Sequence, residues 1–264
     1  MTPSLLTLFC SHYRIPLSLP SADLLSQVLR CFAEIPYENL SKIIRAHEEL
    51  DAHRFQTPEE ILVGHFTTGA GGTCFPLTET LTRLVREIGF DASPILADRR
   101  YGADTHCAVV TSIGSISHLI DPGYLIFSPI PIPPHDGVQC YKTPFSTIQL
   151  AAGPASSNRL DLATVEKDGR IRYRLTYKTT PVDELEFRAA WKRSFDWEMM
   201  TYPVVSSIAG ESQIYVQKSS LTIRTKDSST RTALTSEELV HEISSKLSIS
   251  SDIVRKALSY LKKP

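Results

Sequence analysis

Three residues of this chain carry side chains suited to nucleophilic acyl transfer. Cys74 follows the pair Gly71-Gly72, His106 comes 32 residues later, and Asp121 comes 15 residues after that. A cysteine thiolate attacks acyl carbons, an imidazole takes up its proton, and a carboxylate fixes the tautomer and orientation of the imidazole. If the fold brings these side chains together, the chain is a cysteine-dependent enzyme.

Spacing alone does not decide between this chemistry and an ordinary structural role. A single cysteine in a helix is more often a small buried hydrophobic residue, and a single histidine is more often just hydrogen-bonded. Asp121-Pro122-Gly123 is by itself an ordinary turn signal. The elements that hold these residues must therefore be considered.

The first 90 residues are predicted to be mainly helical. Ser21 can cap a helix that reaches Phe32, and Thr57 opens a second helix with a capping box. Apolar residues at helical spacing predict a third helix that ends at Gly89, which places Cys74 near its first turn. A helix N-terminus and a nearby imidazolium can lower the pKa of a thiol by several units from about 8.5.

From residue 92 onward the pattern indicates strands. Strand-like runs cover residues 93–97, 106–110, 118–120, 160–165 and 170–177. Asp168-Gly169 predicts a hairpin turn between the last two runs. The four prolines of segment 126–134 predict an extended loop instead of a regular element. Helices, then strands, then a mixed tail favour an α+β fold over a doubly wound sheet.

Composition excludes several classes of protein. The 264 residues include 28 Lys plus Arg and 29 Asp plus Glu, so bulk charge does not favour nucleic acid or a membrane surface as partner. No apolar run approaches the roughly 18 residues of a membrane span, and the start lacks the basic region of a signal peptide. Five cysteines without a CxxC pair indicate neither a disulfide framework nor a zinc site. We expect reduced thiols in a cytoplasmic protein without a metal.

Four motifs, in the same order along the chain, resemble those of the arylamine N-acetyltransferases, within the transglutaminase-like cysteine enzymes. The family's I/V-P-F-E-N-L run is matched by Ile35-Pro36-Tyr37-Glu38-Asn39-Leu40, its R-G-G-x-C-F-E-x-N run by 70–78, its T-H run by 105–109 and its D-V-G-F run by 121–124. The likeness covers most of the chain. It implies that Cys74, His106 and Asp121 are catalytic.

The resemblance also implies a fold and a substrate site. The expected fold is α+β, with an N-terminal helical bundle (1–90), a central antiparallel β-barrel (91–190) and a C-terminal α/β lid (191–264), around a cysteine-proteinase-like core. Tyr124 matches the aromatic residue after the family's aspartate, and together with Phe75 and Tyr37 it is assigned to substrate binding.

The implied activity is acyl-CoA-dependent N-acetylation by a ping-pong mechanism. Acetyl-CoA or another acyl-CoA would acylate Cys74, coenzyme A would leave, and an arylamine, hydrazine or other small amine would attack the thioester with His106 as base. No metal, nucleic acid or membrane is implied, and the sequence does not indicate an oligomeric state.

The residues around the cysteine depart from the family pattern. Ala70, Pro76 and Thr78 stand where the family has an arginine, a glutamate and an asparagine, and Glu38 loses its usual arginine partner. Two alternatives therefore stay open. One is an enzyme that forms amides or macrolactams in secondary metabolism from a carrier-protein thioester. The other is a relative with lost or hydrolytic activity.

Overall fold

The computed structural model describes residues 3–50, 53–143, 145–166 and 168–261. Five helices precede the large sheet: α1 (Leu5–Tyr13), α2 (Ala22–Phe32), α3 (Leu40–Glu48), α4 (Pro58–Thr68) and α5 (Cys74–Ile88). Their ends follow local chemistry. The Ser21 hydroxyl accepts a hydrogen bond from the Leu24 amide, Thr57 forms a capping box, and Gly89 closes α5 at a φ of 109°.

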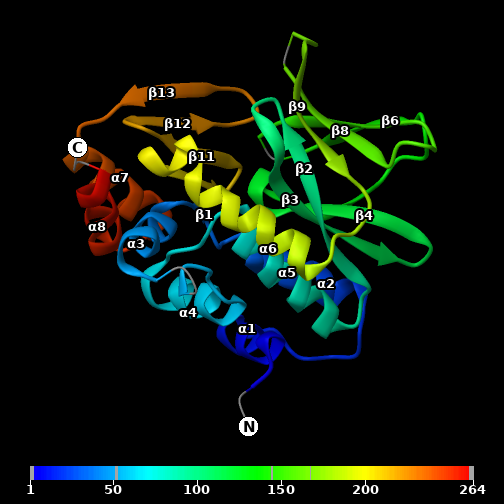
Figure 1. Cartoon of the computed structure of the whole chain (residues 1–264), viewed down its shortest axis with the longest axis horizontal. Coiled ribbons are helices and arrows are strands. Elements are labelled where there is room, and N and C mark those ends of the chain that lie inside the picture. Colours follow the sequence, from blue (N-terminus) through cyan, green and yellow to red (C-terminus); the bar gives the residue numbers. More distant parts are fainter. Residues whose placement is uncertain (1–2, 51–52, 144, 167, 262–264) are drawn as a thin grey trace.

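The middle of the chain forms one antiparallel sheet of eight strands, which curls into a nearly closed barrel (Figure 1). Its order is β5-β4-β3-β2-β9-β8-β7-β6. The strands are β2 (Ala92–Arg99), β3 (Gly102–Ile113), β4 (Ile116–Asp121), β5 (Ile126–Pro131), β6 (Val138–Lys142), β7 (Thr147–Ala152), β8 (Arg159–Val165) and β9 (Ile171–Lys178). The two edges meet where the Tyr141 hydroxyl of β6 donates to the Pro131 carbonyl of β5 at 2.8 Å.

The barrel has its own core, and one of its faces packs against α5. Leu119, Leu150 and Leu175 are among the fully buried residues inside the barrel. On the other face of β2 and β3, Leu96 and Cys107 join the core of the N-terminal helices. Because alternate residues of a strand face opposite sides, β3 carries His106 on one face and Cys107 on the other.

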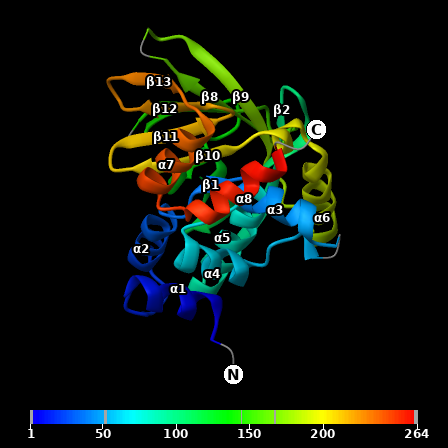
Figure 2. The same ribbon diagram turned by 90° about the vertical axis from the view of Figure 1, so that its left-hand side faces the viewer.

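The C-terminal part adds a second sheet and three helices. Helix α6 (Glu184–Arg193) crosses in front of α5 (Figure 1). Helices α7 (Ser236–Leu247) and α8 (Ser251–Leu261) share a hydrophobic core with the second sheet (Figures 1 and 2). That sheet has the order β1-β10-β11-β12-β13, with β1 (Tyr37–Glu38), β10 (Val204–Ala209), β11 (Ser212–Gln217), β12 (Ser220–Arg224) and β13 (Ser229–Ala233).

Strand β1 joins the two ends of the chain. It comes from the N-terminal part, yet Tyr37 pairs with Ser206 and Glu38 with Val205 of β10. Helix α3, which follows β1, packs against α8.

The expected α+β fold is confirmed, and one local prediction is wrong. Segment 126–134 was expected to be a loop because of its prolines, but residues 126–131 form β5. In the described chain β5 pairs only with β4 and ends the sheet order. An edge strand tolerates proline because one row of its amides needs no partner in the sheet. The division near residues 90 and 190 stays a prediction.

Among the described residues, no helix combines the length and the hydropathy that a membrane crossing requires.

Candidate active site

Cys74 is the first residue of α5 and is fully buried. Its N-cap, Thr73, makes no side-chain hydrogen bond to the helix. Such a bond normally goes to the second or third amide of a helix, and the third residue here is Pro76, which has no N–H. The N-cap side chain therefore leaves the amides of Cys74 and Phe75, at the positive end of the helix, without a cap.

The loop before Cys74 is fixed by close backbone packing. The Glu38 amide donates to the Gly72 carbonyl at 2.9 Å, and the Gly72 amide donates to the Pro36 carbonyl at 3.3 Å. A Cβ on Gly71 would lie 1.9 Å from the Pro36 carbonyl oxygen, so this position accepts only glycine.

The Glu38 carboxylate is hydrogen-bonded to Ser41 and Gly71, and no arginine pairs with it at position 70. This buried carboxylate accepts from the Ser41 amide at 2.9 Å, from the Ser41 hydroxyl, and from the Gly71 amide at 3.2 Å. Burial raises the pKa of Glu38, and these donors oppose the rise. Glu38 thus ties the glycine loop before the cysteine to the start of α3, although Ala70 has no side chain to pair with it.

His106 and Asp121 form a short, fully buried pair. The two side chains come from the adjacent strands β3 and β4, and His106 Nε2 lies 2.6 Å from Asp121 Oδ2. The Tyr177 hydroxyl donates to the same carboxylate oxygen at 2.6 Å, and the Tyr124 amide donates to Oδ1 at 3.0 Å. Because Nε2 faces the carboxylate, Nδ1 is the ring nitrogen left for another partner.

The third predicted residue, Cys74, lies close to this pair, and Gly123 is next to all three side chains. A Cβ on Gly123 would lie 2.6 Å from His106 Cε1, 3.3 Å from Asp121 Oδ1 and 3.3 Å from Cys74 Cβ. The structure therefore brings the three side chains together around one glycine, which leaves room for them because it has no side chain.

The surroundings favour a thiolate at Cys74. A hydrogen bond from Cys107 does most to lower the pKa of Cys74, and His106 and Arg99 lower it further against the opposing effect of burial. Burial and the charge of Arg99 lower the pKa of His106, but Asp121 and a hydrogen bond with Cys74 together outweigh them, and the pKa is raised. Both shifts favour transfer of the thiol proton to His106, while the Arg99 donor 2.9 Å from Nδ1 opposes it.

Sequence reasoning missed the part played by Cys107. Strand alternation predicts that it faces away from His106, and it does, but that side of β3 is where α5 begins. Its thiol lies 3.4 Å from the Thr78 hydroxyl, and that hydroxyl lies 3.4 Å from the Cys107 carbonyl oxygen. Thr78, one of the departures from the family pattern, therefore accepts from the thiol of the residue that does most to lower the pKa of Cys74.

Sequence reasoning also missed Arg99, at the end of β2. Its Nη2 lies 2.9 Å from His106 Nδ1, and its Nη1 donates to the Tyr101 hydroxyl at 2.7 Å. No local motif marks this arginine, because β2 and β3 bring it to the histidine only when they pair.

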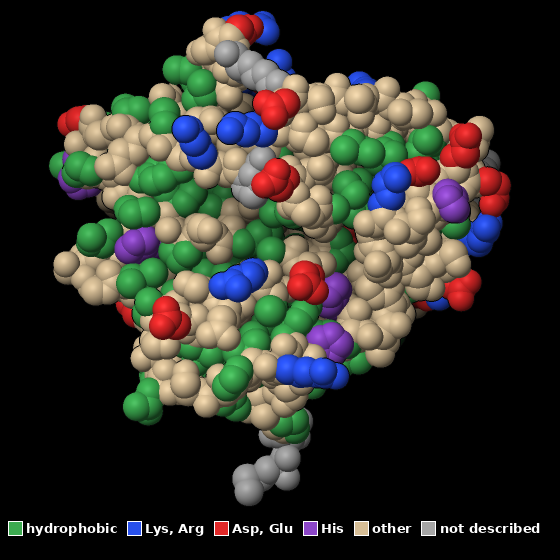
Figure 3. All heavy atoms as spheres, turned by 180° about the vertical axis from the view of Figure 1, so that it is seen from behind, with side chains coloured by type: hydrophobic (Ala, Val, Ile, Leu, Met, Phe, Trp, Pro, Cys, Tyr) green, Lys and Arg blue, Asp and Glu red, His purple; other side chains and the backbone are tan. Residues whose placement is uncertain are grey.

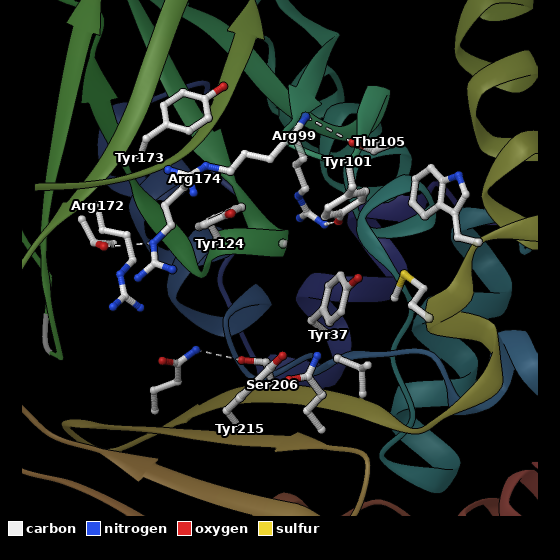
Figure 4. Close-up of a pocket in the computed structure, with 18 of the residues that line it drawn as sticks. Tyr37, Arg99, Tyr101, Thr105, Tyr124, Arg172, Tyr173, Arg174, Ser206 and Tyr215 are labelled. Atoms are coloured by element: carbon white, nitrogen blue, oxygen red, sulfur yellow. Dashed lines mark hydrogen bonds between the residues drawn. The ribbon is translucent and has the colours of Figure 1, made fainter.

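A cavity of about 1350 Å³ lies next to these residues, between the barrel and the second sheet. Tyr37, Arg99, Gly123 and Tyr124 line it. Figure 4 shows Tyr124 and Arg174 entering from the barrel side, while Ser206 and Tyr215 come from the second sheet. The cavity is large enough for a cofactor-sized ligand.

Two of the three residues assigned to substrate binding, Tyr37 and Tyr124, lie at this cavity. Phe75 does not. It is fully buried and packs against Phe187, with ring centroids 5.3 Å apart, and against Trp191 at 6.2 Å. Phe75 therefore lies in the core behind the cysteine, and its assignment to substrate binding stays a prediction.

Among the described residues, no group of three or more His, Cys, Asp and Glu side chains is arranged to hold a metal ion. The side chains that the structure brings together are a buried cysteine at a helix N-terminus, an imidazole and a carboxylate.

Comparisons with known proteins give the family. The profile of the N-acetyltransferase family matches residues 22–255, and a sequence comparison with curated proteins found no match.

Solved structures with the same fold were also found. The arylamine N-acetyltransferase of Mycobacterium abscessus superposes with a TM-score of 0.80 over 98% of this chain and 95% of that one, at 17% identity. The Mycobacterium marinum enzyme in complex with CoA gives 0.80 over 97% and 98%, at 14% identity. A Bacillus cereus enzyme with a Cys-His-Glu triad gives 0.74 over 94% and 100%, at 18% identity. Since the profile covers most of the chain, the chain belongs to the arylamine N-acetyltransferase family.

Proposed function

We propose that this chain is an acyl-CoA-dependent amine N-acyltransferase that works by a ping-pong mechanism through an acyl thioester on Cys74. The observation that carries the proposal is geometric: Cys74 begins α5, Gly123 brings it close to the His106–Asp121 pair, and Gly123 also lines the large cavity. Only the thiolate attacks acyl carbons well.

In the first half-reaction the Cys74 thiolate attacks the carbonyl carbon of an acyl-CoA thioester. The bond from this carbon to the sulfur of coenzyme A breaks, and coenzyme A leaves as a thiol with the proton from the His106 imidazolium. We assign stabilisation of the developing oxyanion to the free amides at the start of α5, which a helix N-terminus makes suitable for negative charge.

In the second half-reaction an amine attacks the Cys74 thioester. His106, now neutral, takes a proton from the amine nitrogen, the amide bond forms, and Cys74 leaves as the thiolate. Asp121 keeps Nε2 protonated, so that Nδ1 is the nitrogen that accepts and returns the proton. Arylamines and hydrazines are the proposed acceptors, following the family.

Coenzyme A is the proposed co-substrate because a member of the family with the same fold has been solved with it. The cavity is suited to its phosphates, since six arginines line it. The altered surroundings of the cysteine also remain ordered: Glu38 has three donors, and Thr78 contacts Cys107. This supports retained catalysis over a dismantled site.

The test is incubation of the protein with acetyl-CoA and other short acyl-CoA esters, followed by intact-mass measurement. We expect one acyl adduct, which is absent in Cys74→Ala. His106→Ala should fold as the wild type does, by circular dichroism, but should not acylate. If His106→Ala acylates at the original rate, the assigned roles are wrong. If no ester gives an adduct and Cys74 does not react with iodoacetamide near neutral pH, the proposed function is refuted.

A further inference from the structure

Arg99 is a permanently charged side chain without a carboxylate partner in the described structure. Its Nη1 donates to the Tyr101 hydroxyl, and its Nη2 lies within hydrogen-bond distance of His106 Nδ1. Its Nε has no hydrogen-bond partner. No carboxylate among the described residues forms an ion pair with it within 4.0 Å. A guanidinium stays protonated in proteins, and the Cys74 thiolate that it helps to stabilise is spent once the thiol is acylated, so a buried cation with a free Nε then remains beside the reacting centre.

Arg99 stands at the wall of the cavity, and its unpartnered Nε is buried there. Arg99 lines the cavity, and Figure 4 shows it among Tyr37, Tyr101 and Tyr124. Its central carbon lies 5.5 Å from the ring centroid of Tyr124 and 5.9 Å from that of Tyr101. At these distances the two rings attract the cation and help to hold it at the cavity wall.

The rest of the cavity wall has the same sign of charge. Five further arginines line it at positions 100, 172, 174, 193 and 224, whereas Glu198 is the one acidic residue among the described lining residues. Some of these arginines are paired: Arg193 meets Asp104 at 3.2 Å, and Arg172 lies 3.6 Å from Glu166. The chain as a whole has a net charge of −1, and Figure 3 shows acidic and basic side chains interspersed on the face it displays. The excess of positive charge is therefore a property of the cavity.

Arg99 differs from these other arginines because it touches the reacting centre. Phosphates of coenzyme A can account for cations along the cavity wall, but a cation 2.9 Å from His106 Nδ1 lies where the acyl group and the attacking amine must meet. The group that Arg99 binds is therefore part of the acyl group or of the amine, close to the bond that is made.

We propose that Arg99 binds a carboxylate carried by the substrate, so that this enzyme prefers a carboxylate-bearing acyl group or amine over the neutral analogue. The inference rests on the proposed function. The Nε and Nη2 groups lie on one edge of the guanidinium and suit the two oxygens of a carboxylate. A carboxylate on that edge takes Nη2 away from His106, which leaves Nδ1 free to exchange a proton with Cys74 or with the amine.

Two sources can supply this carboxylate, and they are tested separately with the full chain. In the donor arm, acylation of Cys74 by malonyl-CoA and succinyl-CoA is compared with acylation by acetyl-CoA. In the acceptor arm, 2-aminobenzoate and 4-aminobenzoate are compared with their methyl esters as acceptors from the acylated enzyme. A charged bidentate hydrogen bond predicts a preference of about ten- to hundred-fold in kcat/KM for the carboxylate in one of the arms.

The variants Arg99→Met and Arg99→Lys test whether this residue carries the preference. We expect Arg99→Met to abolish the preference, and Arg99→Lys to restore part of it through its charge. Arg193→Met is the matched control, because it removes another cation from the same cavity, and it should keep the preference. An equal loss in Arg193→Met would attribute the preference to the summed charge and overturn the role of Arg99.

A binding measurement that needs no turnover separates loss of carboxylate binding from loss of folding or activity in the variants. In the Cys74→Ala background, malonate or 4-aminobenzoate should raise the melting temperature, methyl 4-aminobenzoate should not, and Arg99→Met should remove the difference. If acyl adducts form but neither arm nor the melting shift distinguishes carboxylates from neutral analogues, the inference fails while the proposed function stands. If no acyl-CoA acylates Cys74, the proposed function fails, and the melting shift still decides whether Arg99 binds carboxylates.

Discussion

Gly123→Ala tests whether the small space between Cys74, His106 and Asp121 is required for catalysis. Gly123 lies in the 3-10 turn η2 (Pro122–Tyr124), and its φ lies outside the left-handed range, so alanine introduces no backbone strain. The added Cβ would lie 2.6 Å from His106 Cε1, about 0.8 Å closer than the 3.4 Å at which ordinary contact begins.

The His106 ring has little room in which to move away from the added methyl group. Asp121 holds Nε2 at 2.6 Å, Arg99 holds Nδ1 at 2.9 Å, and the Tyr124 ring stands edge-on with its centroid 5.2 Å from that of the imidazole. The ring must therefore tilt away from the thiol or lose a hydrogen bond. A misplacement of about 1 Å in a catalytic group costs on the order of 100-fold in rate. Overpacking of this kind also costs about 1–3 kcal/mol in the free energy of unfolding.

The assay is the rate of Cys74 acylation, followed by rapid quenching and intact mass, with urea unfolding to measure stability. Gly64→Ala is the matched control, because it adds the same methyl group in α4 with nothing within 4 Å of the new Cβ. It should keep the wild-type rate and gain about 0.5–1 kcal/mol in stability. A folded Gly123→Ala protein that acylates as fast as Gly64→Ala would refute the reasoning.

Three further outcomes are expected. Alkylation of Cys74 by iodoacetamide should slow only as the pH falls through the lowered pKa of its thiol; Cys107→Ala should move this fall to higher pH, and Cys107→Ser, which keeps a donor, should move it less. Tyr177→Phe removes a donor from the Asp121 carboxylate and should lower the free energy of unfolding by about 1.5–3 kcal/mol in urea titrations. Burial lowers the pKa of Lys42 to about 7, so between pH 7 and 10 the unfolded chain binds a proton that the folded chain lacks. The free energy of unfolding should then rise by up to about 1.4 kcal/mol per pH unit, and Lys42→Met should remove this rise; an unchanged slope in that variant would place the effect elsewhere.

Features of the structure that depend on neighbouring residues could be predicted from the sequence. Ser21, Thr57 and Thr235 each cap the helix that follows, because a cap needs only a side-chain oxygen and the amides two or three residues on. The placement of Cys74 at the start of α5 followed from the helical pattern that ends at Gly89.

Features that depend on distant segments could not be predicted in this way. Arg99 reaches His106 because β2 and β3 pair, and Glu38 gains the Gly71 amide because a loop 33 residues away returns to it. The prolines of β5 pointed to a loop, and nothing local could indicate that this strand would end a sheet. The triad resemblance identified residue types, but the hydrogen bonds around them come from tertiary contacts.

The pairing of β1 with β10 has a consequence for the timing of events during synthesis. Tyr37 and Glu38 hold the backbone at Gly72, just before the nucleophile, and they are themselves held by residues 205 and 206. Those residues lie about four fifths of the way along the chain. Until the ribosome has made them, β1 lacks the strand with which it pairs. The loop before the nucleophile therefore takes its final position only after β10 has been made and has paired with β1, late in synthesis.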